Sequence, residues 1–196
     1  MPSGESLRRR PIGAELIRGG VDFRVWAPDH RQAAVVIEAS DFPLERERDG
    51  YFRGVVREAG AGTRYRLRLD GASEAFPDPA SRFQPEGPHG PSVVVDPAAY
   101  QWRDTGWDGV QKEGLVIYEM HIGTFTGEGT WRTAMEKLEP LVDVGINLLE
   151  IMPVNEFPGR FGWGYDGVDL WAPTRLYGPP DDFRAFVDAA HSLRLG

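Results

Sequence analysis

The apolar residues of this chain change their spacing near residue 114. Before that point they alternate with polar residues, as in Val21–Val25 (VDFRV) and Tyr65–Leu69 (YRLRL). A period of two places apolar side chains on one face of a strand and polar side chains on the other. After residue 114, short continuous apolar runs alternate with stretches of helical spacing. The pattern therefore predicts two structural parts of different class.

The first part reads as a series of short strands. Ala33–Glu38 and Tyr51–Val56 are further runs of this kind, and the dipeptides Asp49-Gly50 and Asp70-Gly71 are turn signals between strands. Short strands separated by turns at this spacing are typical of an antiparallel β-sandwich. We therefore predict an all-β, immunoglobulin-like sandwich over residues 13–97.

Three further segments lack the alternation of apolar and polar residues. Proline and glycine crowd residues 77–91, which excludes a helix or a central strand there and predicts an extended segment packed on its neighbour. Residues 98–114 are predicted to be a linker. Residues 1–12 contain Arg8-Arg9-Arg10 with no long apolar run after them, so we predict a disordered tail and not a secretion signal.

From residue 115 the pattern becomes β-α-β-α. Leu115–Tyr118 is a compact apolar strand, and the helical spacing that follows has Thr130 as its N-cap and Gly145 as its C-terminal stop. Pro140 lies inside this helical pattern. Because proline removes one backbone hydrogen bond and crowds the carbonyl four residues earlier, we expect a kink in the helix.

The second unit of this pattern has the same form. Ile146–Val154 is apolar almost throughout, as expected of a strand buried on both faces, and a second helix is predicted to start at Pro180. Two such units leave unpaired strand edges and need neighbours. We predict that residues 115–196 are the first two β/α units of a truncated (β/α)8 TIM barrel. An open doubly wound sheet is the alternative, although no glycine-rich phosphate loop follows either strand.

A long loop follows the second strand, from Asn155 to Pro179, well beyond the usual ~2–6 residues. In parallel barrels the active-site residues lie in loops of this position. Aromatic side chains and glycines fill the loop, and aromatic rings offer flat apolar faces that suit the apolar face of a sugar ring. Trp163, Tyr165 and Asp166, clustered between glycines, are therefore the predicted substrate-binding residues.

Other residues of the loop and strands have alternative interpretations. For the aromatic residues Phe157, Trp171 and Tyr177 we expect packing against the protein. Glu119, His121 and Glu150 lie in or next to the two strands, where they could form a polar network at the barrel mouth or a structural pair satisfied within the fold. No spacing suggests a metal site or a cofactor, and no pair of carboxylates has the spacing that glycoside cleavage needs.

Charge and composition exclude several classes of function. The net charge of −8 disfavours binding to nucleic acid or to an anionic membrane surface. The chain has no cysteine, which excludes disulfides and thiolate metal sites, and no segment has the ~20 apolar residues of a membrane helix. We predict a cytoplasmic protein that acts on a neutral substrate; the oligomeric state is left open.

Four segments of the second part resemble the alpha-amylase family, glycoside hydrolase family 13. They are Ile117–Phe125 (IYEMHIGTF), Glu150–Val154 (EIMPV), Trp163–Pro173 (WGYDGVDLWAP) and Tyr177–Gly196. Val21–Pro28 (VDFRVWAP) is similar to the N-terminal sandwich of the same family. The resemblance covers nearly the whole chain after about residue 12 and implies an enzyme of carbohydrate metabolism.

Within that family, the linker Asp78–Asp96 and the WGYDG segment are most similar to the branch that takes part in trehalose biosynthesis. This resemblance implies a retaining hydrolase that cleaves the alpha-1,4 bond next to the trehalose end of maltooligosyl-trehalose. It also implies that Tyr165 stacks on the sugar, and that the nucleophile and the acid/base lie on later strands, so that no catalytic residue falls within these residues. A glycogen branching enzyme fragment and a non-catalytic glucan-binding fragment are the alternatives.

Overall fold

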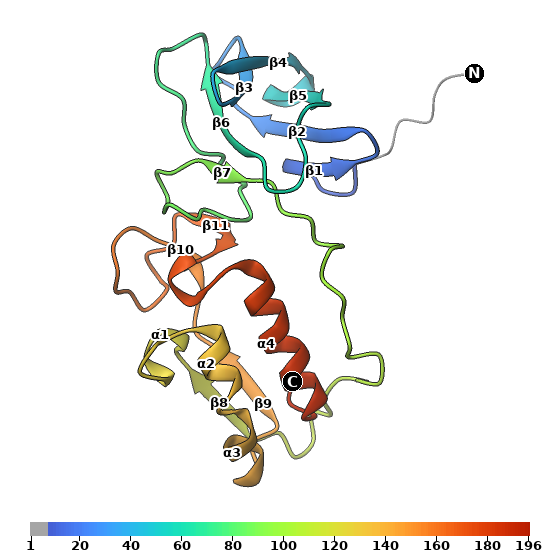
Figure 1. The fold of residues 1–196 in the computed structure, drawn as a ribbon, viewed down its shortest axis with the longest axis vertical. Coiled ribbons are helices and arrows are strands. Elements are labelled where there is room, and N and C mark those ends of the chain that lie inside the picture. Colours follow the sequence, from blue (N-terminus) through green and yellow to red (C-terminus); the bar gives the residue numbers. More distant parts are fainter. Residues whose placement is uncertain (1–7) are drawn as a thin grey trace, which may run out of the picture. The chain divides into compact units, whose positions relative to one another are not determined.

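The computed structural model describes residues 8–196 and divides into two compact units (Figure 1). The first unit holds the chain up to Asp96 together with Val168–Ala172, and the second holds Pro97–Gly167 and Pro173–Gly196. Of the predicted tail, residues 1–7 lie outside the described part of the chain. No helix within residues 8–196 is long and apolar enough to cross a membrane.

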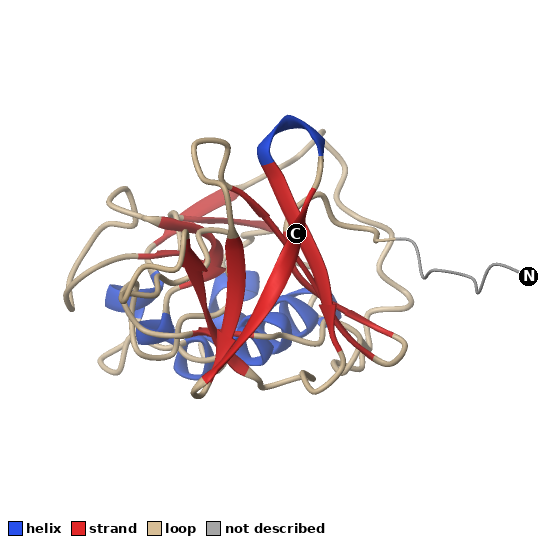
Figure 2. Cartoon of the chain, turned by 90° about the horizontal axis from the view of Figure 1, so that it is seen from above, coloured by secondary structure: helices blue, strands red, loops and turns tan. Residues whose placement is uncertain are grey.

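The first unit is a curled antiparallel sheet (Figure 2). The described residues form seven strands of this sheet, in the order β1-β2-β5-β4-β3-β6-β7. The strands are β1 (Gly13–Ile17), β2 (Gly20–Trp26), β3 (Ala33–Ile37), β4 (Ser40–Arg46), β5 (Tyr51–Val56), β6 (Arg64–Leu69) and β7 (Ser92–Val93), with a 3-10 turn at Arg48–Gly50 before β5. The alternating segments of the sequence are therefore the strands of this sheet.

The sheet is continuous because β4 pairs with two neighbours. Its first residues pair with β3, with Leu44 opposite Ala33, and its last residues pair with β5, with Glu45 opposite Arg53. The predicted all-β class is confirmed. The strand pairing gives one continuous sheet and not the two separate sheets of the predicted sandwich. The curl lets one sheet enclose its own core.

Every second residue of the strands fills that core. Val21 and Phe23 of β2 are buried with Phe52 of β5, and the ring of Phe23 meets that of Tyr65 edge-on at 4.9 Å. Burial of apolar side chains of this size contributes about 1.5–3 kcal/mol each. The apolar residues at alternate positions therefore lie on the inner face of the curled sheet and form one core.

Two buried carboxylates of the first unit have hydrogen-bond partners. Asp22 is fully buried and accepts hydrogen bonds from Arg8 and Arg53, each at 2.7 Å. Asp78, in the proline-rich segment, is buried too and accepts a hydrogen bond of 2.7 Å from the hydroxyl of Tyr65. A buried charge without partners costs several kcal/mol, so these contacts fix the ends of the sheet to its core.

The second unit is a short parallel β/α segment. Its elements are β8 (Ile117–Met120), α1 (Ile122–Phe125), α2 (Trp131–Met135), α3 (Leu138–Asp143), β9 (Leu148–Ile151), β10 (Asn155–Glu156), a 3-10 turn (Arg175–Tyr177) and α4 (Pro180–Ser192); β11 (Asp169–Pro173) precedes that turn. β8 and β9 are parallel neighbours, with Ile117 opposite Leu148 and Met120 opposite Ile151.

The predicted N-cap at Thr130 and the predicted helix start at Pro180 are confirmed. Thr130 caps α2, since its side chain accepts a hydrogen bond from the backbone of Thr133 at 3.3 Å. The helix is then interrupted, and α3 begins at Leu138. The interruption contains Glu136, whose carbonyl would have to accept a hydrogen bond from Pro140 in a continuous helix. The proline therefore divides the helix and does not merely bend it.

Helices pack on one face of the parallel pair. Trp131 is fully buried and stacks on Phe183 of α4 at 4.3 Å, with Met120 of β8 in the same core. The other face carries Ile117, of which 53% is exposed, and the exposed Glu150. The expectation that Ile146–Val154 is a strand buried on both faces is wrong for the described residues, because Glu150 is exposed and helices cover only one side of the strand pair.

The predicted linker, residues 98–114, contains no helix or strand and lies against α4. Buried Asp188 of α4 accepts hydrogen bonds from the Tyr100 hydroxyl at 3.1 Å and from the Arg103 backbone at 2.9 Å. Trp107 stacks on His191 with the ring centroids 3.6 Å apart. These contacts fasten the segment along the helix.

Candidate functional site

A loop rich in aromatic residues lies next to the carboxyl ends of both parallel strands. We call residues 157–167 the aromatic loop. His121 directly follows β8, and Pro153 comes two residues after β9 ends. Because the carboxyl ends of parallel strands meet at one edge, residues from both strands can hold the same loop.

His121 contacts the loop backbone. Its Nε2 atom lies 2.9 Å from the carbonyl oxygen of Gly162 and 3.1 Å from the hydroxyl of Tyr177. Its Nδ1 atom lies 3.2 Å from the hydroxyl of Thr124. The imidazole therefore joins the end of β8 to a position 41 residues further along the chain.

Two glycines bring the loop against the chain that follows β9. Gly164 has φ +91°, and a β-carbon there would collide with the carbonyl oxygen of Pro153. At Gly167, a β-carbon would lie 2.6 Å from that of Asn155. Glycine is needed at 164 both for its positive φ and for this close approach. Tyr165 and Asp166 form the turn between these two fixed points.

The predicted substrate-binding residues are exposed on this turn. Trp163 is 74% exposed, Tyr165 is 69% exposed, and Asp166 is exposed as well. An aromatic side chain loses favourable burial when it is left in water, so three such residues on one short loop, with Phe161 at 91% exposure among them, form an exposed apolar surface. The structure thus places Trp163, Tyr165 and Asp166 together.

The aromatic residues that were predicted to pack against the protein divide into two groups. Phe157 and Tyr177 are buried, as predicted for packing residues, and burial raises the pKa of the Tyr177 hydroxyl. Trp171 is largely exposed, so the prediction that it packs is wrong. Sequence pattern alone does not distinguish these rings, because both groups lie among glycines and prolines.

A buried ion pair at the base of the loop was not predicted. Glu156 is fully buried and forms an ion pair with the guanidinium of Arg175. Its carboxylate also accepts a hydrogen bond from the backbone of Arg175 at 2.8 Å and from that of Phe157 at 3.1 Å. The residues are 19 positions apart, and no local motif joins them. The pair closes the base of the loop and leaves its tip exposed.

The strand carboxylates do not join this site. Glu119 and Glu150 occupy paired positions on β8 and β9, and both are exposed on the open face of the pair. The three polar residues of the strands therefore separate: His121 contacts the aromatic loop, and the two glutamates lie side by side on the sheet. Within residues 8–196, no group of three or more His, Cys, Asp or Glu side chains could hold a metal ion.

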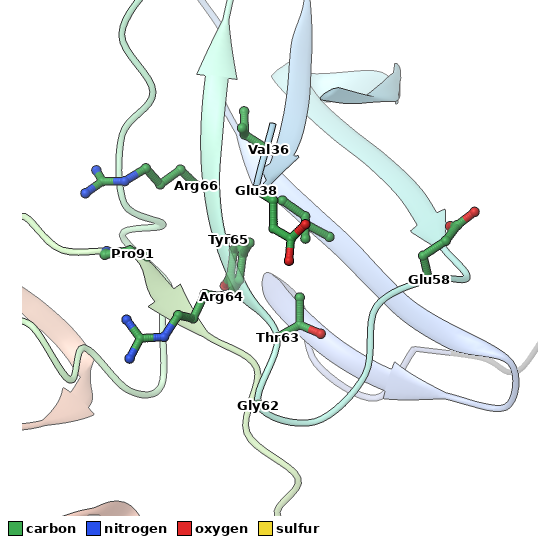
Figure 3. A pocket seen from close by; sticks show the side chains of 10 residues that line it. Val36, Glu38, Glu58, Gly62, Thr63, Arg64, Tyr65, Arg66 and Pro91 are labelled. Carbon is green, nitrogen blue, oxygen red and sulfur yellow. The ribbon is translucent and has the colours of Figure 1, made fainter. Parts of the chain in front are cut away.

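A hollow of about 570 Å³ on the first unit offers another concave surface (Figure 3). Its two arginines are already engaged: Arg64 pairs with Glu86, and Arg66 donates to backbone carbonyls. Tyr65, which also lines it, is buried. Without an exposed aromatic surface, this hollow fits a flat ligand less well than the aromatic loop does.

The chain is similar to larger enzymes that act on glucans. It is 45% identical over 185 residues to a malto-oligosyltrehalose trehalohydrolase of Saccharolobus solfataricus, covering 94% of this chain and 33% of that protein. It is 34% identical over 197 residues to a 1,4-alpha-glucan branching enzyme of Aliivibrio fischeri, covering 90% of this chain and 28% of that protein. No protein-family model matches the chain.

A solved structure shares the fold. A crystal structure described as an alpha amylase from Salmonella typhimurium superimposes with a TM-score of 0.91 and 46% sequence identity, covering 95% of this chain and 32% of that one. The chain thus spans about a third of the length of the relatives that it matches. It is homologous to about the N-terminal 30% of the malto-oligosyltrehalose trehalohydrolases of glycoside hydrolase family 13.

Proposed function

We propose that this chain supplies the glucan-binding N-terminal part of a trehalose-releasing glycoside hydrolase. The observation that carries the proposal is the pair of exposed rings, Trp163 and Tyr165, on a loop fixed by His121, Gly164 and the Glu156 ion pair. A loop backbone that is already held in place loses little conformational entropy when a ligand binds to the loop. The identity to trehalohydrolases supports maltooligosyl-trehalose as the substrate of the whole enzyme.

In this proposal each residue of the turn has a distinct task. The rings of Trp163 and Tyr165 lie against the apolar faces of glucose units, and the carboxylate of Asp166 accepts hydrogen bonds from sugar hydroxyls. Tyr165 binds the unit at the cleavage point. Residues 115–196 form the first two units of a (β/α)8 barrel, which acts in the cytoplasm.

Cleavage itself is assigned to residues beyond this part of the enzyme. A retaining glycosidase needs two carboxyl groups about 5–5.5 Å apart on either side of the bond. Glu119 and Glu150 are neighbours, but they lie in mid-strand on the open face and not on the aromatic loop. We therefore propose that the 196-residue chain binds malto-oligosaccharides and does not hydrolyse them.

Calorimetric titration with maltoheptaose and with maltooligosyl-trehalose tests this function. We expect saturable binding to the chain, and Tyr165→Ala to weaken it by about 1–3 kcal/mol, the range for an aromatic ring stacked on a flat ligand. Trp102→Ala is the matched control, since this exposed tryptophan lies outside the aromatic loop and its loss leaves the affinity unchanged. Equal affinity in the wild type and Tyr165→Ala contradicts the proposed site.

A branching-enzyme fragment is the second candidate, favoured by the 34% identity to that enzyme class. The two ligands distinguish the candidates. A part of a trehalohydrolase prefers maltooligosyl-trehalose to a malto-oligosaccharide of equal length, whereas a part of a branching enzyme has no reason to prefer the trehalose end. Equal affinity for the two ligands favours the second candidate.

A further inference from the structure

The hydrogen-bonding partners of His121 determine where its proton lies. The carbonyl oxygen of Gly162 can only accept a hydrogen bond, and it lies 2.9 Å from Nε2. This contact is a hydrogen bond only if Nε2 carries the proton. In the neutral ring Nδ1 is then an acceptor, and the hydroxyl of Thr124 at 3.2 Å donates to it. The hydroxyl oxygen of Tyr177 faces the same Nε2 proton and accepts from it.

The ring is also held by packing. A β-carbon at Gly123 would lie 2.8 Å from the ring of Tyr177 and 2.9 Å from that of His121, so glycine at 123 leaves room for both rings. Tyr177 is buried and meets Trp131 edge-on at 6.1 Å, at the centre of the second unit's core. A continuous series of contacts thus runs from Trp131 through Tyr177 and His121 to Gly162.

The last contact ends beside an exposed ring, because Gly162 precedes Trp163. We propose that His121 is a positioning residue: its Nε2–H fixes the carbonyl of Gly162 and so holds Trp163 and Tyr165 in the arrangement that receives a glucan. The part of this inference that concerns the glucan rests on the proposed function. The part that concerns the order of the aromatic loop stands on the contacts alone.

Two amide variants separate the two ring nitrogens. In His121→Gln the side-chain amide reaches as far as Nε2 and can still donate to Gly162. In His121→Asn the amide is one carbon shorter, so it reaches the position of Nδ1 and leaves the Gly162 carbonyl without its donor. His191→Asn is the control, because this histidine bonds Asp104 and stacks on Trp107, away from the aromatic loop.

Hydrogen exchange of the amides of residues 157–167 is the first readout. We expect His121→Asn to speed this exchange about tenfold, the equivalent of one lost hydrogen bond, while His121→Gln and His191→Asn leave it within about threefold of the wild type. The affinity for maltoheptaose is the second readout. We expect His121→Asn to lose about tenfold in affinity, and His121→Gln and His191→Asn to bind about as tightly as the wild type. Unchanged loop exchange in His121→Asn overturns the proposal.

The two readouts keep this inference separate from the proposed function. Faster loop exchange in His121→Asn, with no maltoheptaose binding by any form, supports the positioning of the loop and contradicts the glucan site. Faster exchange with unchanged affinity overturns the link between His121 and the glucan. If His121→Asn does not fold, the nitrogen NMR spectrum of the unsubstituted chain decides: a neutral His121 ring protonated at Nε2 supports the proposal, and one protonated at Nδ1 overturns it.

Discussion

In the first unit a seven-stranded sheet curls around its own core, whereas in the second unit two parallel strands are covered by helices on one face only. Phe23 and Val21 of the first sheet are almost completely buried, while Ile117 on the open face of the second sheet is 53% exposed. Antiparallel strands can leave one face in water when that face is polar. Parallel strands with apolar residues on both faces cannot do so without a cost.

This difference suggests how each unit is stabilised. The first unit depends on burial within one sheet, and its buried Asp22 is paired with Arg53. The second unit depends on its helices and on the fixed aromatic loop, and one face of its strand pair is open, with Ile117 exposed beside Glu119 and Glu150. The five predictions below test this contrast.

The largest effect is expected in the closed core. Phe23→Ala should cost about 3–5 kcal/mol of the first unit's unfolding free energy, because it removes a fully buried ring and leaves a cavity. Ile117→Ala on the open face should cost less than about 1 kcal/mol. Denaturant unfolding of both variants measures the two values. A cost for Ile117→Ala as large as that for Phe23→Ala would show that the open face is buried.

The next effect concerns the aromatic loop. Gly164→Ala should destabilise the second unit by at least about 2 kcal/mol, because it combines a positive φ with a collision against Pro153. Gly159→Ala is a matched control with the same φ of +91° and no atom within 4 Å of the added carbon. It should cost only the ~1–2 kcal/mol of the backbone conformation. Equal costs in thermal unfolding would mean that Gly164 does not hold the loop against Pro153.

Acid should affect a buried carboxylate of each unit in opposite directions. Burial raises the pKa of Asp78 in the first unit, despite the hydrogen bond from Tyr65. Burial also acts on Asp188 in the second unit, but hydrogen bonds from Arg103 and Tyr100 outweigh it and lower that pKa. A raised folded pKa gives stability that is present below the unfolded value and lost as pH rises; a lowered one gives stability that is lost as pH falls.

The test is the free energy of unfolding between about pH 2 and pH 7, measured for the wild type and for two variants that each lack one of the carboxylates. Relative to Asp78→Asn, the wild type should gain stability as the pH falls towards the ordinary aspartate value of 3.8. Relative to Asp188→Asn, it should lose stability as the pH falls below 3.8. If the two differences in unfolding free energy between wild type and variant change in the same direction as the pH falls, the contrast between the two carboxylates is contradicted.

The smallest effect concerns the two glutamates on the open face. Glu119 and Glu150 are like charges at paired positions of neighbouring strands, an arrangement that is destabilising. Glu150→Gln should therefore stabilise the second unit by about 0.2–1 kcal/mol. Adding Glu119→Gln should give little more, because the repulsion is already gone. A loss of stability in Glu150→Gln would reveal a favourable partner for this carboxylate.

Local pattern predicted the elements of both units well. The alternation of Val21–Val25 and Tyr65–Leu69 predicted strands and Thr130 predicted a helix cap, whereas Pro140 predicted a kink where the structure has two separate helices. These features depend on neighbours within a few residues, so the sequence contains all the physical information that they need. The assignment of Trp163, Tyr165 and Asp166 to substrate binding came from rings placed between glycines, and it stays a prediction.

Features that depend on distant residues could not be predicted. The continuous sheet requires β4 to pair with both β3 and β5, and alternation does not specify partners. His121 meets Gly162 across 41 residues, and Glu156 meets Arg175 across 19. The apolar sequence of a strand likewise indicates that its surface should be buried, but it does not identify the element that covers the surface. The open face of β8 and β9 was therefore not predicted.

Native-state hydrogen exchange tests the contrast between the two units most directly, because it measures local stability at each backbone amide. We predict that the amides of Tyr65–Leu69, in β6 between β3 and β7 of the curled sheet, exchange more slowly than those of Ile146–Val154, around β9. Slower exchange in Ile146–Val154 than in Tyr65–Leu69 would contradict the account, because the half-covered parallel strands would then be the more stable part of the chain.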